Sequence, residues 1–220
     1  MPKNDFSRRK FLRYAGAASG LVVVAASCNK DDVASNGTLD GVDLGTGDIG
    51  ILNYAYALEQ LEAAFYTQVI MSQFSGMSST EMTLLTDIRD HEIAHREFFK
   101  TALAGQAIMD LEVDFSSIDF GSRDSVLATA KAFEDLGVSA YNGAGRLIVN
   151  PDYLVIAGKI VSVEARHAAL IRDLISMGSF ADDTVIDANG LDVTRKPSEV
   201  LVIAQPYIKT TINADNLPTY

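Results

Sequence analysis

Apolar and small side chains recur at helical spacing in four long stretches of the chain, which predicts an all-α protein. The first pair of predicted helices covers residues 49–73 and 79–103, and the second pair covers residues 122–147 and 150–175. Asp48 is the expected N-cap of the first helix. Four amphipathic helices of this length predict a four-helix bundle.

The segments outside these helices complete the predicted fold. Residues 106–122 lack helical spacing, and an extended connection of this length fits a long crossover between the second and third helices of a bundle. The tail, residues 179–220, contains one short predicted helix at about residues 197–204. We expect the bundle to occupy residues 49–178 and the short helix to pack on it.

Two of the three histidines follow a glutamate by three positions inside a predicted helix. The two pairs are Glu92 with His95 and Glu164 with His167. Residues three apart lie on one helix face, about one turn from each other, so each pair can bind the same metal ion. A single pair would be a weak signal, but the duplicated one is more informative.

Each pair is preceded by a helix that carries another glutamate and, seven residues later, a tyrosine. These are Glu59 with Tyr66 and Glu134 with Tyr141. Seven steps of a helix return to about the same face, so each tyrosine is expected to point inward beside its glutamate. There it could donate a hydrogen bond to a ligand carboxylate of a neighbouring helix or carry an electron. A plain core tyrosine is the alternative.

Along the chain, a single glutamate is followed by a glutamate–histidine pair, and this two-part pattern occurs twice. This order is that of a carboxylate-bridged site for two metal ions in a four-helix bundle. The predicted ligands are Glu59, Glu92, His95, Glu134, Glu164 and His167. Carboxylate and imidazole ligands suit two iron ions or two manganese ions, and the chain has a single cysteine, which argues against zinc–thiolate or iron–sulfur sites.

Two further residues near these positions need an interpretation. Glu62 lies one turn after Glu59 and could replace it or join it as a ligand. His91 directly precedes Glu92 and therefore points about 100° away from it. We expect His91 to lie at the surface or beside a ligand.

The N-terminus reads as an export signal. Residues 1–27 combine a basic start, a short apolar stretch and small residues before Cys28. The hexapeptide Ser-Arg-Arg-Lys-Phe-Leu at residues 7–12 resembles a twin-arginine signal, and Cys28 is the candidate for lipid attachment, with simple cleavage as the alternative. Residues 28–48 are rich in Asp, Gly, Ser and Thr and are expected to form a flexible tether. These features predict a lipid-anchored protein of the cell envelope, in the periplasm or on the outer membrane.

Net charge narrows the range of partners. The chain carries −11 at pH 7, and removal of residues 1–27 takes away five basic residues and one acidic residue, which leaves −15. Such a surface repels nucleic acid, so no nucleic-acid partner is expected. The oligomeric state is left open by the sequence.

The residues named above resemble the ferritin-like superfamily of di-metal carboxylate proteins. Residues 133–141 and the short helix at residues 197–204 are similar to the desiccation-related branch of exported ferritin-like domain proteins. The resemblance covers roughly residues 49–207. It implies a ferritin-like four-helix bundle, a di-iron or di-manganese centre and redox chemistry with dioxygen or hydrogen peroxide.

Three functions remain open on this basis. The leading hypothesis is an exported oxidoreductase in stress protection, of a ferroxidase or peroxide-consuming type. The second is a non-catalytic envelope protein whose metals hold the helices together. The third is iron storage, which the export signal, the tether and the long tail make less fitting.

Overall fold

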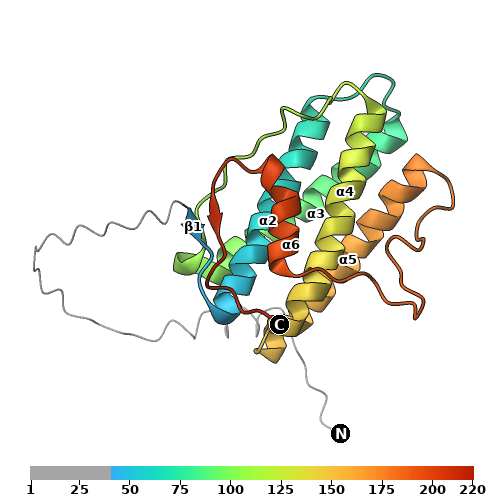
Figure 1. Ribbon diagram of the computed structural model, residues 1–220. Coiled ribbons are helices and arrows are strands. Elements are labelled where there is room, and N and C mark those ends of the chain that lie inside the picture. The colour runs from blue at the N-terminus through green and yellow to red at the C-terminus, as the bar shows by residue number, and fades with distance from the viewer. Residues whose placement is uncertain (1–40) are drawn as a thin grey trace, which may run out of the picture. The chain divides into compact units, whose positions relative to one another are not determined.

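The computed structural model describes residues 41–220. Four long helices form the bundle, and a short helix and a two-stranded sheet lie outside it (Figure 1). The elements are β1 (Val42–Asp43), α2 (Gly47–Met71), α3 (Ser79–Leu103), α4 (Arg123–Ala144), α5 (Pro151–Ile175), α6 (Pro197–Ala204) and β2 (Ile212–Asn213). The predicted signal peptide and Cys28 lie outside the described residues.

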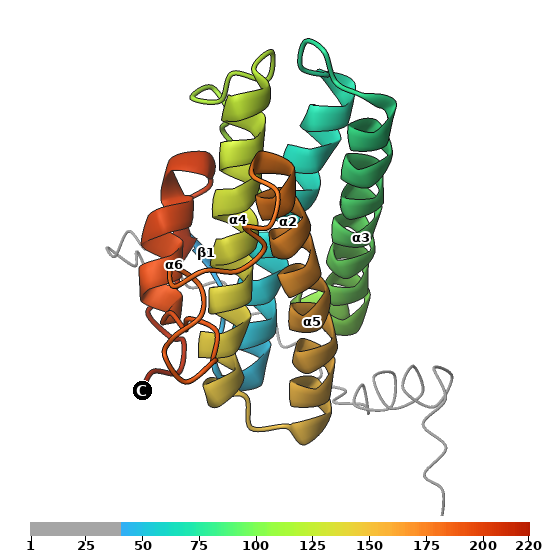
Figure 2. The same ribbon diagram turned by 90° about the vertical axis from the view of Figure 1, so that its right-hand side faces the viewer.

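The helices pack in two antiparallel pairs, α2 with α3 and α4 with α5, each joined by a short connection. The connection from α3 to α4 runs the length of the bundle, so α3 and α4 point in the same direction (Figure 1). α6 packs against α4, on the side away from α3 (Figure 2). The predicted all-α bundle with a long crossover between its second and third helices is therefore confirmed. No helix within residues 41–220 is both long enough and apolar enough to cross a membrane.

The first residues of α2 and α3 show which capping side chains are used in the structure. Ser78 caps α3 and forms a reciprocal capping box with Glu81. The expected N-cap role of Asp48 is wrong, because α2 begins at Gly47 and Thr46 occupies the N-cap position. The Asp48 carboxylate instead accepts hydrogen bonds from the backbone N–H groups of Val149 and Asn150, both at 2.8 Å. It thereby holds the start of α2 to the turn between α4 and α5.

α2 is the most enclosed helix, and almost every residue from Gly50 to Tyr66 is buried. Its polar side chains bind the crossover: Asn53 accepts a hydrogen bond from Ile108 N–H, and Gln60 accepts one from Leu111 N–H. These side-chain amides pair with backbone N–H groups of the crossover, which belong to no helix or sheet that could pair them. The long crossover is therefore held against α2 by specific hydrogen bonds.

The end of the predicted tether is also part of the fold. β1 pairs in parallel with β2, and Leu44 is fully buried in the core. Thus residues 41–46 belong to the folded domain, although the sequence analysis placed them in the flexible segment 28–48.

The tail approaches α4 closely at Gly143. The backbone N–H of Arg195 donates to the Ser139 carbonyl, and its guanidinium donates to the Ser139 hydroxyl. A Cβ atom on Gly143 would lie 1.7 Å from the Arg195 carbonyl oxygen. Only glycine leaves room for this contact.

We expect Gly143→Ala to push the tail off α4 and to lower the free energy of unfolding by about 1–3 kcal/mol, as overpacking does. Urea denaturation and limited trypsin digestion near Arg195 would measure the two effects. Gly158→Ala on α5 is the matched control, because nothing lies within 4 Å of the added Cβ. This control should gain about 0.5–1 kcal/mol from helix propensity. Equal behaviour of the two variants would contradict the tight contact.

Candidate metal centre

Six acidic and imidazole side chains meet between the four long helices. Glu59 and Glu134 are buried residues of α2 and α4. On α3 and α5, Glu92 and Glu164 follow the buried residues Ile88 and Ile160 by one helical turn, so both glutamates face inward. Their side chains are fully buried, which is rare for glutamate without a partner. The six residues are Glu59, Glu92, His95, Glu134, Glu164 and His167.

The six form two overlapping groups of four, and each group could hold a metal ion. In the first group, His95 Nδ1 lies 2.8 Å from Glu164, 3.3 Å from Glu59 and 3.6 Å from Glu92. Ligand atoms from α2, α3 and α5 therefore surround one point.

The second group repeats this arrangement with the helix pairs exchanged. His167 Nδ1 lies 2.8 Å from Glu92, 3.5 Å from Glu134 and 3.7 Å from Glu164. Glu92 and Glu164 belong to both groups, while Glu59 and Glu134 each belong to one. The duplicated sequence pattern thus gives a site with approximate two-fold symmetry.

Many of the facing atoms lie close to one another without forming a hydrogen bond of normal geometry. Buried polar atoms are normally paired, because an unpaired one costs free energy. Here the unpaired atoms are Glu59 Oε2, both oxygens of Glu92 and of Glu164, Glu134 Oε2, and Nδ1 of His95 and of His167. Bound cations would satisfy all of them at once, so these residues fit a metal site.

Burial and mutual contact shift the acidity of the cluster in the metal-free protein. Burial raises the pKa of Glu134 to about 8, and burial likewise raises the pKa of Glu59 well above its usual value. Burial opposes the charge of His95 and His167, but their carboxylate contacts prevail and raise the pKa of each to about 12. Burial also acts on Glu92, yet the two histidines lower its pKa to about 2. Cation binding would release protons from this cluster.

The two tyrosines cross between the halves of the bundle. Tyr66 on α2 donates a hydrogen bond of 2.5 Å to Glu134 on α4, and Tyr141 on α4 donates one to Glu59 on α2. Burial raises the pKa of both hydroxyls well above the usual value, so both stay protonated and remain donors. Each hydrogen bond fixes one carboxylate oxygen, and the other oxygen faces the centre.

Comparison with known families agrees with this geometry. The sequence profile of the ferritin-like domain matches residues 47–177, which include all four long helices from end to end. The chain belongs to the ferritin-like domain family. No curated protein matches the chain.

Glu62 of this ferritin-like domain lies outside both groups. It is buried, and its carboxylate lies where α4 has Gly137: a Cβ on Gly137 would be 3.1 Å from Glu62 Oε1. Gly137 occupies the position in the repeat that Glu62 occupies on α2. Burial and the neighbouring carboxylates raise the pKa of Glu62 well above its usual value. The structure thus groups Glu59, and not Glu62, with the facing donor atoms.

His91 contacts the ferritin-like centre from outside. Its Nδ1 lies 2.8 Å from His167 Nε2, and the two rings stack at 5.1 Å. The helical phase placed His91 off the ligand face, at the surface or beside a ligand, and the structure agrees. The sequence did not identify His167 as the partner, because His167 is on another helix. A group bound to the outer nitrogen of an imidazole sets the orientation and tautomer of the ring.

We expect His91→Phe to weaken metal binding at the His167 half by about 10-fold, because stacking is kept and the hydrogen bond is lost. Binding at the His95 half should stay unchanged, which provides an internal reference. Competition titration with a chelating dye would resolve the two affinities. Equal weakening of both halves would mean that His91 acts on the fold and not on His167.

Proposed function

We propose that this protein is a di-metal oxidoreductase that holds two iron or two manganese ions and reacts with dioxygen or hydrogen peroxide. The observation that supports it best is the pair of symmetric four-residue groups that share Glu92 and Glu164. Shared carboxylates between two imidazoles suit two neighbouring ions of this type. When bound, such a pair would supply two electrons in a single encounter with the oxidant.

The chain's own residues prepare this chemistry. Glu92 and Glu164 would hold both ions at once, and Glu59 and Glu134 would each close one end. Tyr66 and Tyr141 keep those end carboxylates in place through hydrogen bonds from other helices. Because the carboxylates are buried, their field acts in a medium of low dielectric constant and is poorly screened by salt.

Turnover assays test the proposal. Fe(II)-loaded protein should take up dioxygen or consume hydrogen peroxide, or the manganese form should disproportionate peroxide. Glu134→Gln should lower the rate, and Glu97→Gln should not, because Glu97 is an exposed residue of α3 bound to Arg96. Metal-loaded protein that is inactive in every assay would contradict the proposal.

Two further measurements, melting temperature and size-exclusion chromatography, test the alternative functions. Full burial of the carboxylates favours a structural role for the metals as one alternative. In that case Glu134→Ala would lower the melting temperature without changing turnover. A large symmetric assembly in size-exclusion chromatography would favour iron storage.

We further propose that the protein works outside the cytoplasm, anchored by a lipid on Cys28, in protection against oxidative stress. The proposed location rests on residues 1–28 alone, and the proposed stress role rests on the proposed reaction with dioxygen or hydrogen peroxide. Mass spectrometry of the mature N-terminus tests the anchor. Cys28→Ala should release the protein from the membrane fraction, and an unprocessed N-terminus would contradict export.

A further inference from the structure

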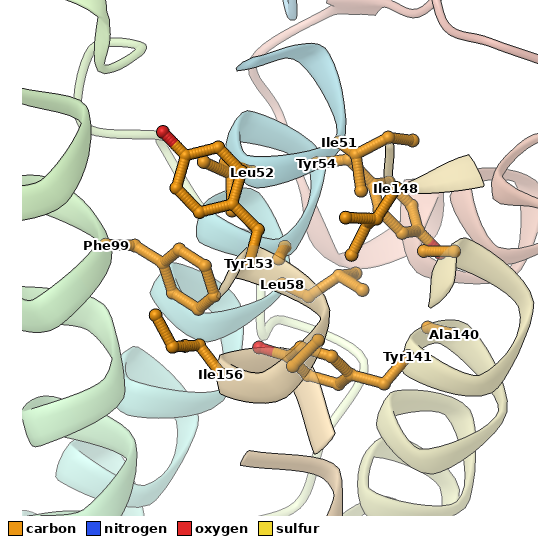
Figure 3. Close-up of a pocket in the computed structure, with 13 residues that line it drawn as sticks. Ile51, Leu52, Tyr54, Leu58, Phe99, Ala140, Tyr141, Ile148, Tyr153 and Ile156 are labelled. Atoms are coloured by element: carbon orange, nitrogen blue, oxygen red, sulfur yellow. The ribbon is translucent and has the colours of Figure 1, made fainter. Parts of the chain in front are cut away.

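A small apolar pocket lies between the long helices on the Tyr141 side of the metal centre. Figure 3 shows Leu58, Phe99 and Ile156 turned toward the same space, with the Tyr141 ring beside them. The pocket has a volume of about 20 Å³ and is lined almost wholly by apolar atoms. One water needs about 10–15 Å³ and two to four polar partners, so this space fits a small apolar molecule better than water.

The pocket borders one half of the carboxylate cluster. Tyr141 lines it and donates its hydroxyl hydrogen bond to Glu59. Leu58 directly precedes Glu59, and Phe99 lies one turn after His95 on α3. A molecule in the pocket is thus separated from the Glu59–His95 half by a single layer of side chains.

The equivalent place at the other half is filled. Tyr66 packs edge to face against Phe65, with ring centroids 5.1 Å apart. The Phe65 ring also contacts Phe115, Phe120 and Phe133 at centroid distances of 5.1–6.0 Å. The two halves of the bundle therefore differ at this place: aromatic rings fill the space beside Tyr66, and an apolar pocket lies beside Tyr141.

A polar molecule has a different approach. The His95 side chain is 14% exposed, and His91 lies at the surface against His167, so the α3–α5 face offers polar groups to solvent. The Tyr141 hydroxyl is engaged by Glu59. Tyr54 and Tyr153 also line the pocket, and the buried Tyr54 hydroxyl has no hydrogen-bond partner, but almost none of the pocket surface is polar. Hydrogen peroxide would lose its hydrogen bonds to water on entering the pocket, and the pocket has almost no polar surface to replace them. Dioxygen has no such bonds to lose.

We propose that dioxygen reaches the Glu59–His95 half of the metal centre through this pocket. Dioxygen, and not hydrogen peroxide, is then the oxidant that the protein uses. The inference rests on the proposed function and narrows it, since that function leaves the choice between dioxygen and peroxide open. Metal binding itself does not depend on the pocket.

Xenon is a direct probe, because it is apolar and enters dry cavities that also admit small gases. Crystals under xenon pressure should show a xenon atom among Leu58, Phe99 and Ile156, with or without metal. Ala157→Phe places a ring in the pocket from the partly exposed side of α5 and should abolish this peak. Absence of xenon from the wild-type pocket would overturn the proposal.

Kinetics separate the pocket from the metal site. Ala157→Phe should raise the KM for dioxygen at least several-fold, with unchanged metal content and unchanged peroxide kinetics. Ala157→Leu is the milder companion if the larger ring prevents folding, and it should give a smaller rise in the same direction. Ala128→Leu on the exposed side of α4 is the control and should match the wild type.

The possible failures are distinguishable. A filled pocket with an unchanged KM for dioxygen would overturn this inference and leave the proposed function intact. Wild-type turnover with peroxide alone would do the same. A metal-loaded wild type that consumes neither oxidant would overturn the proposed function, whatever the xenon experiment shows.

Discussion

Glu92→Ala is expected to remove metal from both halves of the centre, because Glu92 belongs to both ligand groups. Metal content should fall from about two ions per chain to close to none, since each half loses a shared carboxylate. Glu134→Ala should cost only one ion, because Glu134 belongs to a single group. Elemental analysis after dialysis would measure both numbers.

Glu97→Ala is the control for this pair of variants. It removes a glutamate from the same helix, but one whose side chain is 53% exposed and paired with Arg96. It should keep the full metal content. If Glu92→Ala and Glu134→Ala lost the same amount of metal, the shared role of Glu92 would be wrong.

Metal removal is expected to lower the melting temperature by about 16–32 °C. One ion at about 1,000 times its dissociation constant stabilises the folded state by about 4 kcal/mol, so two ions contribute about 8 kcal/mol. For a domain of this size, each kcal/mol corresponds to about 2–4 °C. Without metal, four buried carboxylates face each other, and the two imidazoles are the only groups in the two ligand sets that can offset their negative charge. Scanning calorimetry before and after chelation would measure the change.

The Glu92→Ala variant isolates the cause of this loss. Its melting temperature should no longer respond to chelation, because it has no metal to lose. A wild-type protein of proven metal content whose melting temperature is the same before and after chelation would show that the ions do not support the fold.

The features of this structure that depend on the helical repeat of about 3.6 residues were predictable from the sequence. Helical spacing gave α3 and α5 closely, and the glutamate–histidine pairs on them face each other as their phase requires. The crossed hydrogen bonds of Tyr66 and Tyr141 follow from the same phase, since seven residues return to one face. Local geometry is enough for such features once the bundle is assumed.

The remaining features depend on contacts between distant segments. Strand β1 has two residues and pairs with β2 about 170 positions away, so it leaves no alternation to detect. Asp48 has a good capping side chain, but the N–H groups of the α4–α5 turn bind it instead. His91 contacts His167 and Gly143 admits Arg195 only because other elements approach them. Sequence spacing within one helix carries no information about such neighbours.

Anomalous diffraction from crystals grown with iron or manganese tests the central claim most directly. The account predicts two peaks inside the bundle, both beside Glu92 and Glu164, one nearer His95 and the other nearer His167. Peaks only at surface carboxylates, or none at all at full metal supply, would contradict it.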